Sequence, residues 1–395
     1  MKLLLILSRY RLTGTCLTAG KDYSMNQELV RQITVSDSGA LKSFVALEKK
    51  LLASYPFFVP ASDNDTIGQL SGQTPVFKDI ELTLFIVSNG EEDVARCAAL
   101  VNRSYQEAKQ EALGFIGYFA AAPDHELQVK AMLEQAEGWL NAREVTRIIA
   151  PHNGVFFGNV GSRTDAFDEE PIFPFNWDPP YYADYLESAG YKKSYPLWSY
   201  RVDFSSEKYR AVTRRASGNS GVLVRPINKK RWNEDIEIFR QILNQTFIEE
   251  WEFYPQGNKE FHEFFNSQKM IIDPRLILIA EIEGRPVGIC LGYPNWNPLI
   301  RTFNGKFGLI QIIKFMLTKE RYSSGGLVMI AVLPGNRGKG IAHSLAVTLY
   351  ERYRERGLKE AEYHFVNEIN TKSRRFAESM GGIGRVLYHC FDKNL

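Results

Sequence analysis

Hydrophobic positions alternate between short β-type runs and helical stretches along the whole chain, and this pattern predicts an α/β protein. Residues 82–87 and 94–101 are apolar runs joined by a turn at Gly90, which is typical of a β-hairpin. A second hairpin of the same kind is centred on Gly284. Between such strands, apolar residues recur at helical spacing, as in the segment from Val129 to Leu140.

Two landmarks recur at nearly the same spacing in the two halves of the chain. The hairpin glycines Gly90 and Gly284 lie 194 residues apart (284 − 90), and the helix-ending glycines Gly190 and Gly381 lie 191 apart (381 − 190). A shared offset predicts a tandem duplication. The alternative is coincidence, because glycine commonly ends helices in unrelated proteins.

A polar stretch rich in Ser, Gly and Arg, residues 205–221, lies between the two halves and is predicted to be a linker. It divides the chain into predicted domains at 25–204 and 222–395. Residues 1–24 precede the first regular segment, and we expect them to be an extension outside the fold. The segment 153–180 is rich in Gly, Phe and Pro without periodicity, which predicts a long loop over a surface or a cleft.

Composition narrows the classes of partner. The 395 residues include 48 basic and 46 acidic side chains, so the net charge of +2 favours neither nucleic acid nor a membrane as partner, although a local basic patch remains open. No apolar run reaches the ~18 residues that a membrane span needs, and we expect a cytoplasmic protein. The cysteines are too scattered to predict a disulfide framework or a metal site: Cys16, Cys97, Cys290 and Cys390.

The most informative segment is an apolar strand, residues 326–333, that runs through a glycine-rich turn into a helix beginning at Ile341. The first turn of a helix presents unpaired N–H groups and the positive end of its dipole, which together bind anions. Gly338 and Gly340 let an anion approach the backbone, and Arg337 and Lys339 add positive charge. The segment therefore predicts a phosphate site.

Three alternatives for this turn are disfavoured. A Walker-type loop requires Ser or Thr after its lysine, whereas Gly340 follows Lys339. A dinucleotide fold would place its glycine motif early in a βαβ unit, but this strand lies near the end of the chain. A purely structural turn gains nothing from the two cationic side chains.

These residues resemble a known family. Arg337-Gly338-Lys339-Gly340-Ile341-Ala342 matches the Arg/Gln-x-x-Gly-x-Gly/Ala signature of the GNAT superfamily of acyl-CoA N-acyltransferases, and Asn370 to Ser373 is similar to the helix start beside the pantetheine arm. The resemblance implies that an acyl-CoA, acetyl-CoA above all, is the co-substrate and that no metal is needed. The residues implied to hold it are Ile330, Val332, Arg337, Gly338, Lys339, Gly340, Ile341, Ala342, Asn370 and Ser373.

The whole chain from about Gln27 also resembles bacterial proteins with two GNAT-like halves, through Asp178-Pro179-Pro180-Tyr181-Tyr182. This resemblance implies two tandem domains, each with a mixed, largely antiparallel sheet flanked by helices. The first half departs from the family pattern, because its strand-to-helix turn, 120–126, has no glycine. Asp124, the predicted helix cap, and Glu126 would also repel pyrophosphate. We expect this half not to bind coenzyme A.

Candidate catalytic residues follow the first helix of the second half, in Glu249-Glu250-Trp251-Glu252-Phe253-Tyr254. Glu250 as base and Tyr254 are the predicted catalytic residues, and a solvated acidic run is the alternative. Family enzymes often carry a tyrosine one turn before the closing glycine as general acid, and here that position is Ala377. Its absence is expected to lower the rate without preventing the reaction.

The predicted acceptor-binding residues are Trp251, Tyr293, Asn295 and Asn297, since aromatic and amide side chains in a proline-bounded loop often line ligand sites. His343 and His364 have side chains that could titrate near neutrality. The function implied is acyl transfer, most simply of acetyl, to the amine of a small molecule or peptide entering between the halves. The alternative is a non-catalytic acyl-CoA-binding or structural protein.

Overall fold

The computed structural model describes residues 29–217 and 221–395 of the chain, so the predicted extension over residues 1–24 lies outside the described part. The first half consists of the following elements: β1 (Val30–Ile33), α2 (Ser38–Leu52), α3 (Asp63–Leu70), η1 (Pro75–Phe77), β2 (Ile80–Ser88), β3 (Asp93–Asn102), α4 (Arg103–Lys109), β4 (Leu113–Ala121), α5 (Glu126–Asn141), β5 (Arg147–Ala150), β6 (Ser162–Arg163), α6 (Tyr181–Ser188) and β7 (Lys192–Asp203).

The second half repeats this order of strands and helices. Its elements are α7 (Glu207–Ser217), β8 (Leu223–Pro226), η2 (Lys229–Arg231), α8 (Trp232–Thr246), α9 (Asn258–Gln268), η3 (Pro274–Leu276), β9 (Ile277–Ile282), β10 (Arg285–Pro294), α10 (Asn297–Arg301), α11 (Leu309–Thr318), β11 (Gly325–Val332), η4 (Pro334–Asn336), α12 (Ile341–Glu355), β12 (Glu360–Asn367), α13 (Thr371–Ser379) and β13 (Gly382–Asn394).

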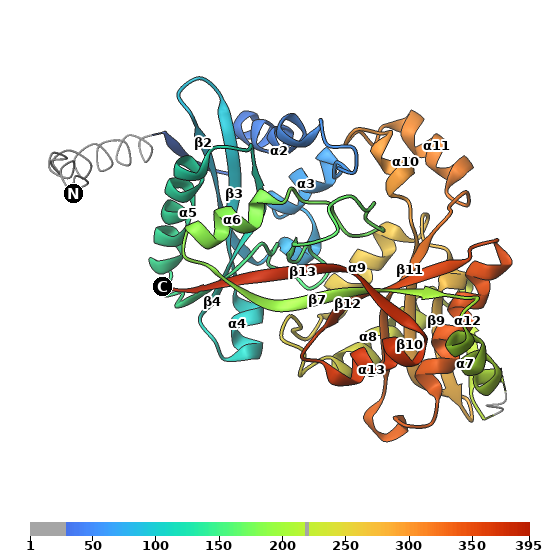
Figure 1. Ribbon diagram of the computed structural model, residues 1–395. Coiled ribbons are helices and arrows are strands. Elements are labelled where there is room, and N and C mark those ends of the chain that lie inside the picture. The colour runs from blue at the N-terminus through green and yellow to red at the C-terminus, as the bar shows by residue number, and fades with distance from the viewer. Residues whose placement is uncertain (1–28, 218–220) are drawn as a thin grey trace, which may run out of the picture.

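One continuous, largely antiparallel sheet runs through both halves, in the order β1-β2-β3-β4-β5-β13-β7-β12-β11-β10-β9-β8. The order is symmetric about its centre, because each of these strands of the first half has its counterpart at the mirrored place in the second, whereas β6 lies off this path and pairs with β13. The long strands β7 and β13 lie side by side across the middle of the molecule (Figure 1). This arrangement is the α/β fold with a tandem repeat that the sequence predicts.

The two halves exchange their last strands. β13, the final strand of the chain, pairs with β5 of the first half through Phe391 and Ala150. β7, the final strand of the first half, pairs with β12 of the second half through Val202 and Ala361. Each half therefore completes the sheet of the other.

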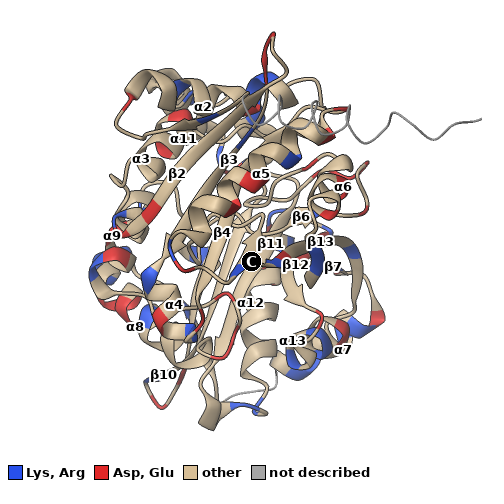
Figure 2. Ribbon diagram, turned by 90° about the vertical axis from the view of Figure 1, so that its left-hand side faces the viewer, with Lys and Arg blue, Asp and Glu red and all other residues tan. Residues whose placement is uncertain are grey.

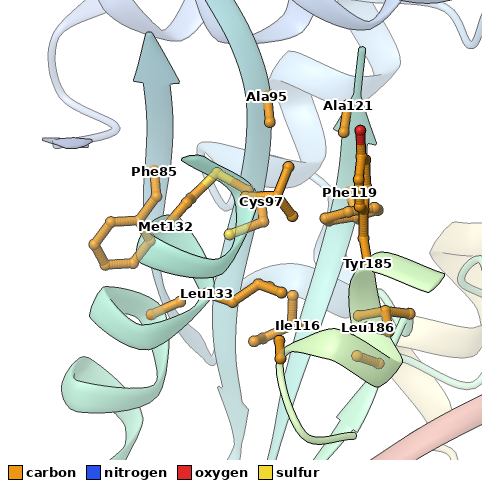
Figure 3. Packing of buried hydrophobic residues seen from close by; sticks show 14 of the residues in the cluster. Phe85, Ala95, Cys97, Ile116, Phe119, Ala121, Met132, Leu133, Tyr185 and Leu186 are labelled. Carbon is orange, nitrogen blue, oxygen red and sulfur yellow. The ribbon is translucent and has the colours of Figure 1, made fainter. Parts of the chain in front are cut away.

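Local elements follow the hydrophobic pattern closely. Both predicted hairpins form, as β2 with β3 and as β9 with β10. The predicted inner face of α5 is fully buried from Val129 to Leu140, and Figure 3 shows Met132 and Leu133 of α5 packed among side chains from β2, β3, β4 and α6. The predicted cap is wrong by one residue: His125 occupies the N-cap position, and Asp124 precedes it with a φ of 62°.

The segment predicted to be a linker contains a helix instead. Residues 207–217 form α7, which packs against α12 and α13. Tyr209 and Val212 on one face of α7 are buried in the core of the second half. With only two apolar residues among many Ser and Arg side chains, the segment lacks the wide apolar face that identifies a helix in a sequence, and its polar composition predicted a linker.

Candidate active site

The central feature of the second half is a V-shaped gap between its two parallel strands. β11 and β12 pair only at Gly326 with Glu362 and at Leu327 with Tyr363, after which the strands diverge. Beyond that point β11 still has its antiparallel neighbour β10 on one side, but its other edge has no strand in register. An unpaired strand edge can accept an extended ligand as an additional strand.

A β-bulge lies where the strands begin to diverge. Leu327 pairs with Gly292 of β10 and Met329 pairs with Leu291, so Val328 is the extra residue. A bulge leaves one residue unpaired and redirects the strand. After it, Met329 faces the core beneath α8 and α9, whereas before it Leu327 faces the core beneath α12.

The predicted cofactor residues of β11 and α12 lie along the path from this bulge to the glycine turn. Ile330 and Val332 are half-buried on the free part of β11, packed against the core under α12. Ala342 is half-buried in the first turn of α12. The path is therefore apolar along the strand and polar at its end.

The glycine turn presents a bare helix N-terminus to solvent. Gly338 and Gly340 have φ values of 81° and 76°, in the left-handed region that favours glycine. Gly340 is the N-cap of α12 and supplies no side chain to bond the first N–H groups, and α12 begins at Ile341. Arg337 and Lys339 are exposed on the same turn. Backbone donors, dipole and cations converge here as predicted for an anion site.

A cleft of about 700 Å³ adjoins the turn, reaching Gly340 and His343 and lying between α7, α12 and α13. Lys208 and Arg215 of α7 and Arg375 of α13 line it. Figure 2 shows ribbon segments coloured for Lys and Arg along α7 and α13. The cleft thus extends the positive site by a second basic wall, which the linker interpretation of 205–221 missed. Lys208 and Arg215, seven residues apart, share one face of a helix, and this spacing could have revealed it.

The start of α13 borders the diverging end of β12. Asn370 caps α13 by accepting a hydrogen bond from the Ser373 N–H, and its amide donates to Glu250 Oε1 at 2.7 Å. The Ser373 hydroxyl lies 2.5 Å from the Tyr363 hydroxyl. Burial raises the pKa of Tyr363 to about 12, so this phenol keeps its proton at neutral pH. Tyr363 is a hydroxyl donor at the vertex of the V that sequence reasoning did not identify.

Two carboxyl groups of the loop between α8 and α9 have raised pKa values. Burial, opposed by Lys109, raises the pKa of Glu250, whose carboxylate also lies within the electrostatic reach of Arg337 and Lys372. Burial and the neighbouring Glu250 raise the pKa of Glu252 to about 7. A carboxyl group that titrates near neutrality is suited to accept a proton from a substrate. The acidic run is therefore partly buried, with Glu250 bonded to Asn370 and Glu252 within the electrostatic reach of Glu250 and Lys109.

Tyr254 and Trp251 of the same loop pack against the first half. Tyr254 is 9% exposed and contacts the ring of Tyr105 from α4. The indole of Trp251 stacks on Tyr195 of β7 at 4.0 Å between ring centroids. These contacts dock the loop and do not support a catalytic role for Tyr254.

The predicted acceptor residues of the β10 to α10 connection hold the long loop of the first half. The Asn295 side chain accepts a hydrogen bond from the Phe173 N–H, and the Asn297 amide donates to the Pro171 carbonyl. Both asparagines are buried, and Tyr293 packs edge-on against Phe173. They shape the wall between the halves, so their assignment as direct acceptor ligands stays a prediction.

The two histidines singled out in the sequence, His343 and His364, both have lowered pKa values. Burial lowers the pKa of His364 to about 3 and also lowers the pKa of His343. The Ser199 hydroxyl donates its single proton to Glu362. It must therefore act as acceptor toward His364 Nδ1, 2.7 Å away, which places the ring proton of His364 on Nδ1. Nε2 of His364 is then a bare acceptor, buried and unpartnered, close to Gly326 at the vertex.

Ala377 is completely buried in the core of the second half. Its carbonyl oxygen lies only 2.7 Å from where a side chain at Gly382 would begin. A tyrosine at residue 377 would overpack this core, so the family position for the general acid is a core position here.

The equivalent V of the first half is filled by its own side chains. β4 and β5 also pair over a short stretch and then diverge, but Asn153 follows β5 and bonds the Tyr118 N–H at 2.9 Å. Tyr182 and Tyr181 of α6 bond the N–H and carbonyl of Ala121 at the end of β4. The backbone groups that would meet a ligand are already engaged.

Among residues 29–217 and 221–395, no group of three or more His, Cys, Asp or Glu side chains could hold a metal ion. Within the same described ranges, no helix is both long and apolar enough to cross a membrane.

Comparison with known proteins agrees with this geometry. Residues 236–382 match the model of the acetyltransferase (GNAT) family. The chain is 27% identical over 374 residues to the bacterial ceramide synthase of Caulobacter vibrioides, covering 92% of this chain and 97% of that protein. It is 25% identical over 380 residues to the protein YghO of Escherichia coli, covering 93% and 96%.

Among solved structures, a tandem GNAT protein from the clavulanic acid biosynthesis pathway superposes with a TM-score of 0.54 at 11% identity, covering 92% of this chain and 98% of that one. At this identity the likeness concerns the fold alone. Residues 236–382, in the second half, match the GNAT family, and the open V with its glycine turn and the mirrored first half give the whole chain the fold of a tandem GNAT protein.

Proposed function

We propose that the second half binds an acyl-CoA and transfers its acyl group to an amine. The observation that carries this proposal is the free edge of β11, which leads from the bulge at Val328 straight to the uncapped N-terminus of α12. An extended thiol arm with a diphosphate at its end fits both features at once. The domain boundaries near 205–221 are part of the proposal.

Each part of the site has a distinct task in this proposal. The amides from Gly338 to Ala342 bind the diphosphate, and the basic cleft lined by Lys208, Arg215 and Arg375 accepts the phosphorylated nucleoside end. The free edge of β11 pairs with the amide groups of the thiol arm. A backbone N–H at the bulge polarises the thioester carbonyl.

Proton transfers assign roles to the remaining side chains. The acceptor nitrogen attacks the thioester carbon, and the carbon–sulfur bond breaks as the new carbon–nitrogen bond forms. Glu252 takes the proton from the nitrogen, because its pKa lies close to neutrality. Tyr363 supplies a proton to the leaving sulfur, and Glu250 holds Asn370 beside the thiol arm.

The name of one relative suggests a further acyl donor and acceptor. The sequence alone favours acetyl-CoA, but the relative from Caulobacter vibrioides is named a ceramide synthase. A ceramide is the amide of a fatty acid with a long-chain amino alcohol, so its synthesis is also acyl transfer to an amine. We therefore extend the proposal to a long-chain acyl donor and a lipid amine acceptor, which compete with acetyl and a small or peptide amine.

Thiol release tests the proposal directly. Purified full-length protein is incubated with acetyl-CoA or palmitoyl-CoA and with amino acids, polyamines, peptides or a sphingoid base, and free thiol and amide product are measured. We expect turnover with at least one pair, lost in the Glu252→Gln variant. Tight acyl-CoA binding without thiol release from any pair would instead establish the alternative, a non-catalytic acyl-CoA-binding protein.

A further inference from the structure

The helix α11 carries its apolar side chains on the outside. Of its ten residues only Phe315 is buried, where it packs against Trp296 at 5.2 Å between ring centroids. Leu309, Ile310 and Leu317 are 74%, 77% and 75% exposed. In an ordinary surface helix the apolar side chains face the core. The α11 apolar face consists of Leu309, Ile310, Ile312, Ile313, Met316 and Leu317.

These six side chains form one continuous face. At about 100° per residue they span roughly 160° of the helix circumference, and Gln311 and Thr318 lie on the opposite side with Phe315. Met270, which is 66% exposed, adjoins the end of the helix, since Lys319 donates a hydrogen bond to its carbonyl oxygen. Exposed apolar surface of this extent marks an interaction site.

The segment that carries the face holds charges of one sign, and the nearest acidic residue that follows it in the chain is Glu320, directly after Lys319. From residue 297 to residue 319 the chain contains no Asp or Glu. It contains four basic residues, and Lys306, Lys314 and Lys319 form no ion pair with any described residue. Lys306 precedes α11 and Lys319 follows it, so cations flank the apolar face at both ends.

We propose that α11 docks the protein onto the surface of an anionic lipid bilayer. A short helix with a wide apolar face and flanking lysines lies in the plane of the membrane interface, its apolar face among the acyl chains and its lysines at the anionic headgroups. At about 1.5 Å per residue α11 is ~15 Å long, which suits an interfacial position and not a span.

This surface adjoins the acceptor side of the molecule. α11 follows the segment from Asn295 to Arg301, and Arg301 of α10 pairs with Glu170 of the long loop between the halves. Figure 1 shows α10 and α11 together at one end of the molecule, away from α7 and α13. Docking through α11 therefore leaves the basic cleft open to the aqueous side. Net charge alone predicts no membrane partner, and the proposal rests instead on the local basic patch that the composition left open.

Vesicle flotation tests the proposal with the full-length protein. Wild-type protein is mixed with vesicles of phosphatidylcholine alone or of phosphatidylcholine with phosphatidylglycerol. We expect binding to the mixed vesicles, weakened when ionic strength rises from about 0.1 M to about 1 M, where the Debye length falls from about 10 Å to about 3 Å. The Ile310→Glu/Leu317→Glu variant should bind at least about tenfold more weakly.

Two controls make the result decisive. Ile383→Glu changes a 74% exposed isoleucine on β13 and should leave vesicle binding unchanged. The triple variant Lys306→Gln/Lys314→Gln/Lys319→Gln should lose the preference for anionic vesicles. Absence of wild-type binding at low salt, or equal binding by the α11 variant, overturns the proposal. So does light scattering that shows a dimer which only the α11 variant dissociates, because the face is then covered by a second copy.

The proposal does not depend on the proposed function. Acyl-CoA affinity, measured by calorimetry, should be the same for wild type and the α11 variant, which also establishes that the variant is folded. Loss of acyl-CoA binding in the wild type would contradict the enzymatic proposal and leave the vesicle result standing.

Discussion

The two halves share one fold, but the V between their parallel strands is open in the second half and filled in the first. In the second half, β11 and β12 diverge around a free strand edge that ends at an uncapped helix with Arg337 and Lys339. In the first half, Tyr185 accepts a hydrogen bond from the His125 N–H at the start of α5 and donates one to the Ala122 carbonyl. The comparison teaches that a binding gap can be converted into core by a few hydroxyl groups, with no change of topology.

The charged side chains at the helix that follows the V also differ between the two halves. Asp124 and Glu126 lie at the start of α5, and their negative charges interact favourably with the positive end of the helix dipole, so no ligand is needed there. At the corresponding start of α12 no acidic side chain is present in the first turn. The start of α5 is thus stabilised by side chains of the chain itself, whereas we propose that the start of α12 is stabilised by a bound anion.

The largest expected effect concerns Glu252 of the second half, the proposed proton acceptor. Replacing Glu252 by Gln should lower kcat by about 10²- to 10⁴-fold with the best acceptor, because general base assistance is lost. In the wild type, kcat/KM should fall as pH drops below about 7, since the Glu252 carboxyl is then protonated. Steady-state rates across pH measure both effects.

The same carboxyl affects stability with a defined sign. Its folded-state pKa is raised above the ordinary value of 4.5, so the folded protein binds this proton more tightly than the unfolded chain. The resulting stabilisation is complete below about pH 4.5 and is lost as pH rises through about 7. The wild-type protein should therefore lose stability relative to Glu252→Gln over that range, and a pH-independent difference would contradict the assignment.

The next effect tests the anion site itself. Gly340→Asp places a negative charge at the N-terminus of α12, and acyl-CoA affinity should fall at least tenfold, about 1.4 kcal/mol, in a calorimetric titration. Gly340→Asn is the matched control, because Asn also tolerates the left-handed φ and has nearly the same size. Equal losses in the two variants would mean that shape, and not charge, governs the site.

A third variant addresses the closed gap. Tyr185→Phe removes the hydroxyl that bonds His125 and Ala122, and we expect a loss of about 1–2 kcal/mol in the free energy of unfolding, measured with urea. Acyl-CoA affinity should stay unchanged. New acyl-CoA binding in this variant would show that the first half is only masked.

The smallest effect is expected for Glu126→Ala. Its helix terminus is assigned to no ligand, so acyl-CoA affinity should match that of the wild type within calorimetric error. A marked change in affinity would mean that both halves contribute to one cofactor site, and the contrast between them would have to be abandoned.

Local sequence signals predicted the elements that are local in the structure. The hairpins at Gly90 and Gly284 and the turn from Gly338 to Gly340 involve residues close together in the chain, so spacing alone indicates them. The resemblance to a family then indicated an acyl-CoA as the ligand of that turn, and the family match over residues 236–382 agrees with this expectation.

Features that depend on distant pairing could not be predicted. The bulge at Val328 appears only in its register with β10, and the hydroxyl pair of Tyr363 and Ser373 forms only because β12 and α13 meet. Hydrophobic periodicity identifies apolar positions but not which element covers them, so the apolar run of Leu309–Thr318 does not by itself reveal an exposed face. The closed V required Tyr181 and Tyr182 to be placed against β4, although their motif was visible.

The exchange of final strands has a consequence for how the chain folds as it is synthesised. β5 needs residues 391–394 as its neighbour, and Phe391 follows Ala150 by 241 residues (391 − 150). The first half therefore waits with one sheet edge unpaired while nearly two hundred residues are added, and such an edge is open to wrong pairing. The sheet of the first half is complete only after β13, the last strand of the second half, has been synthesised.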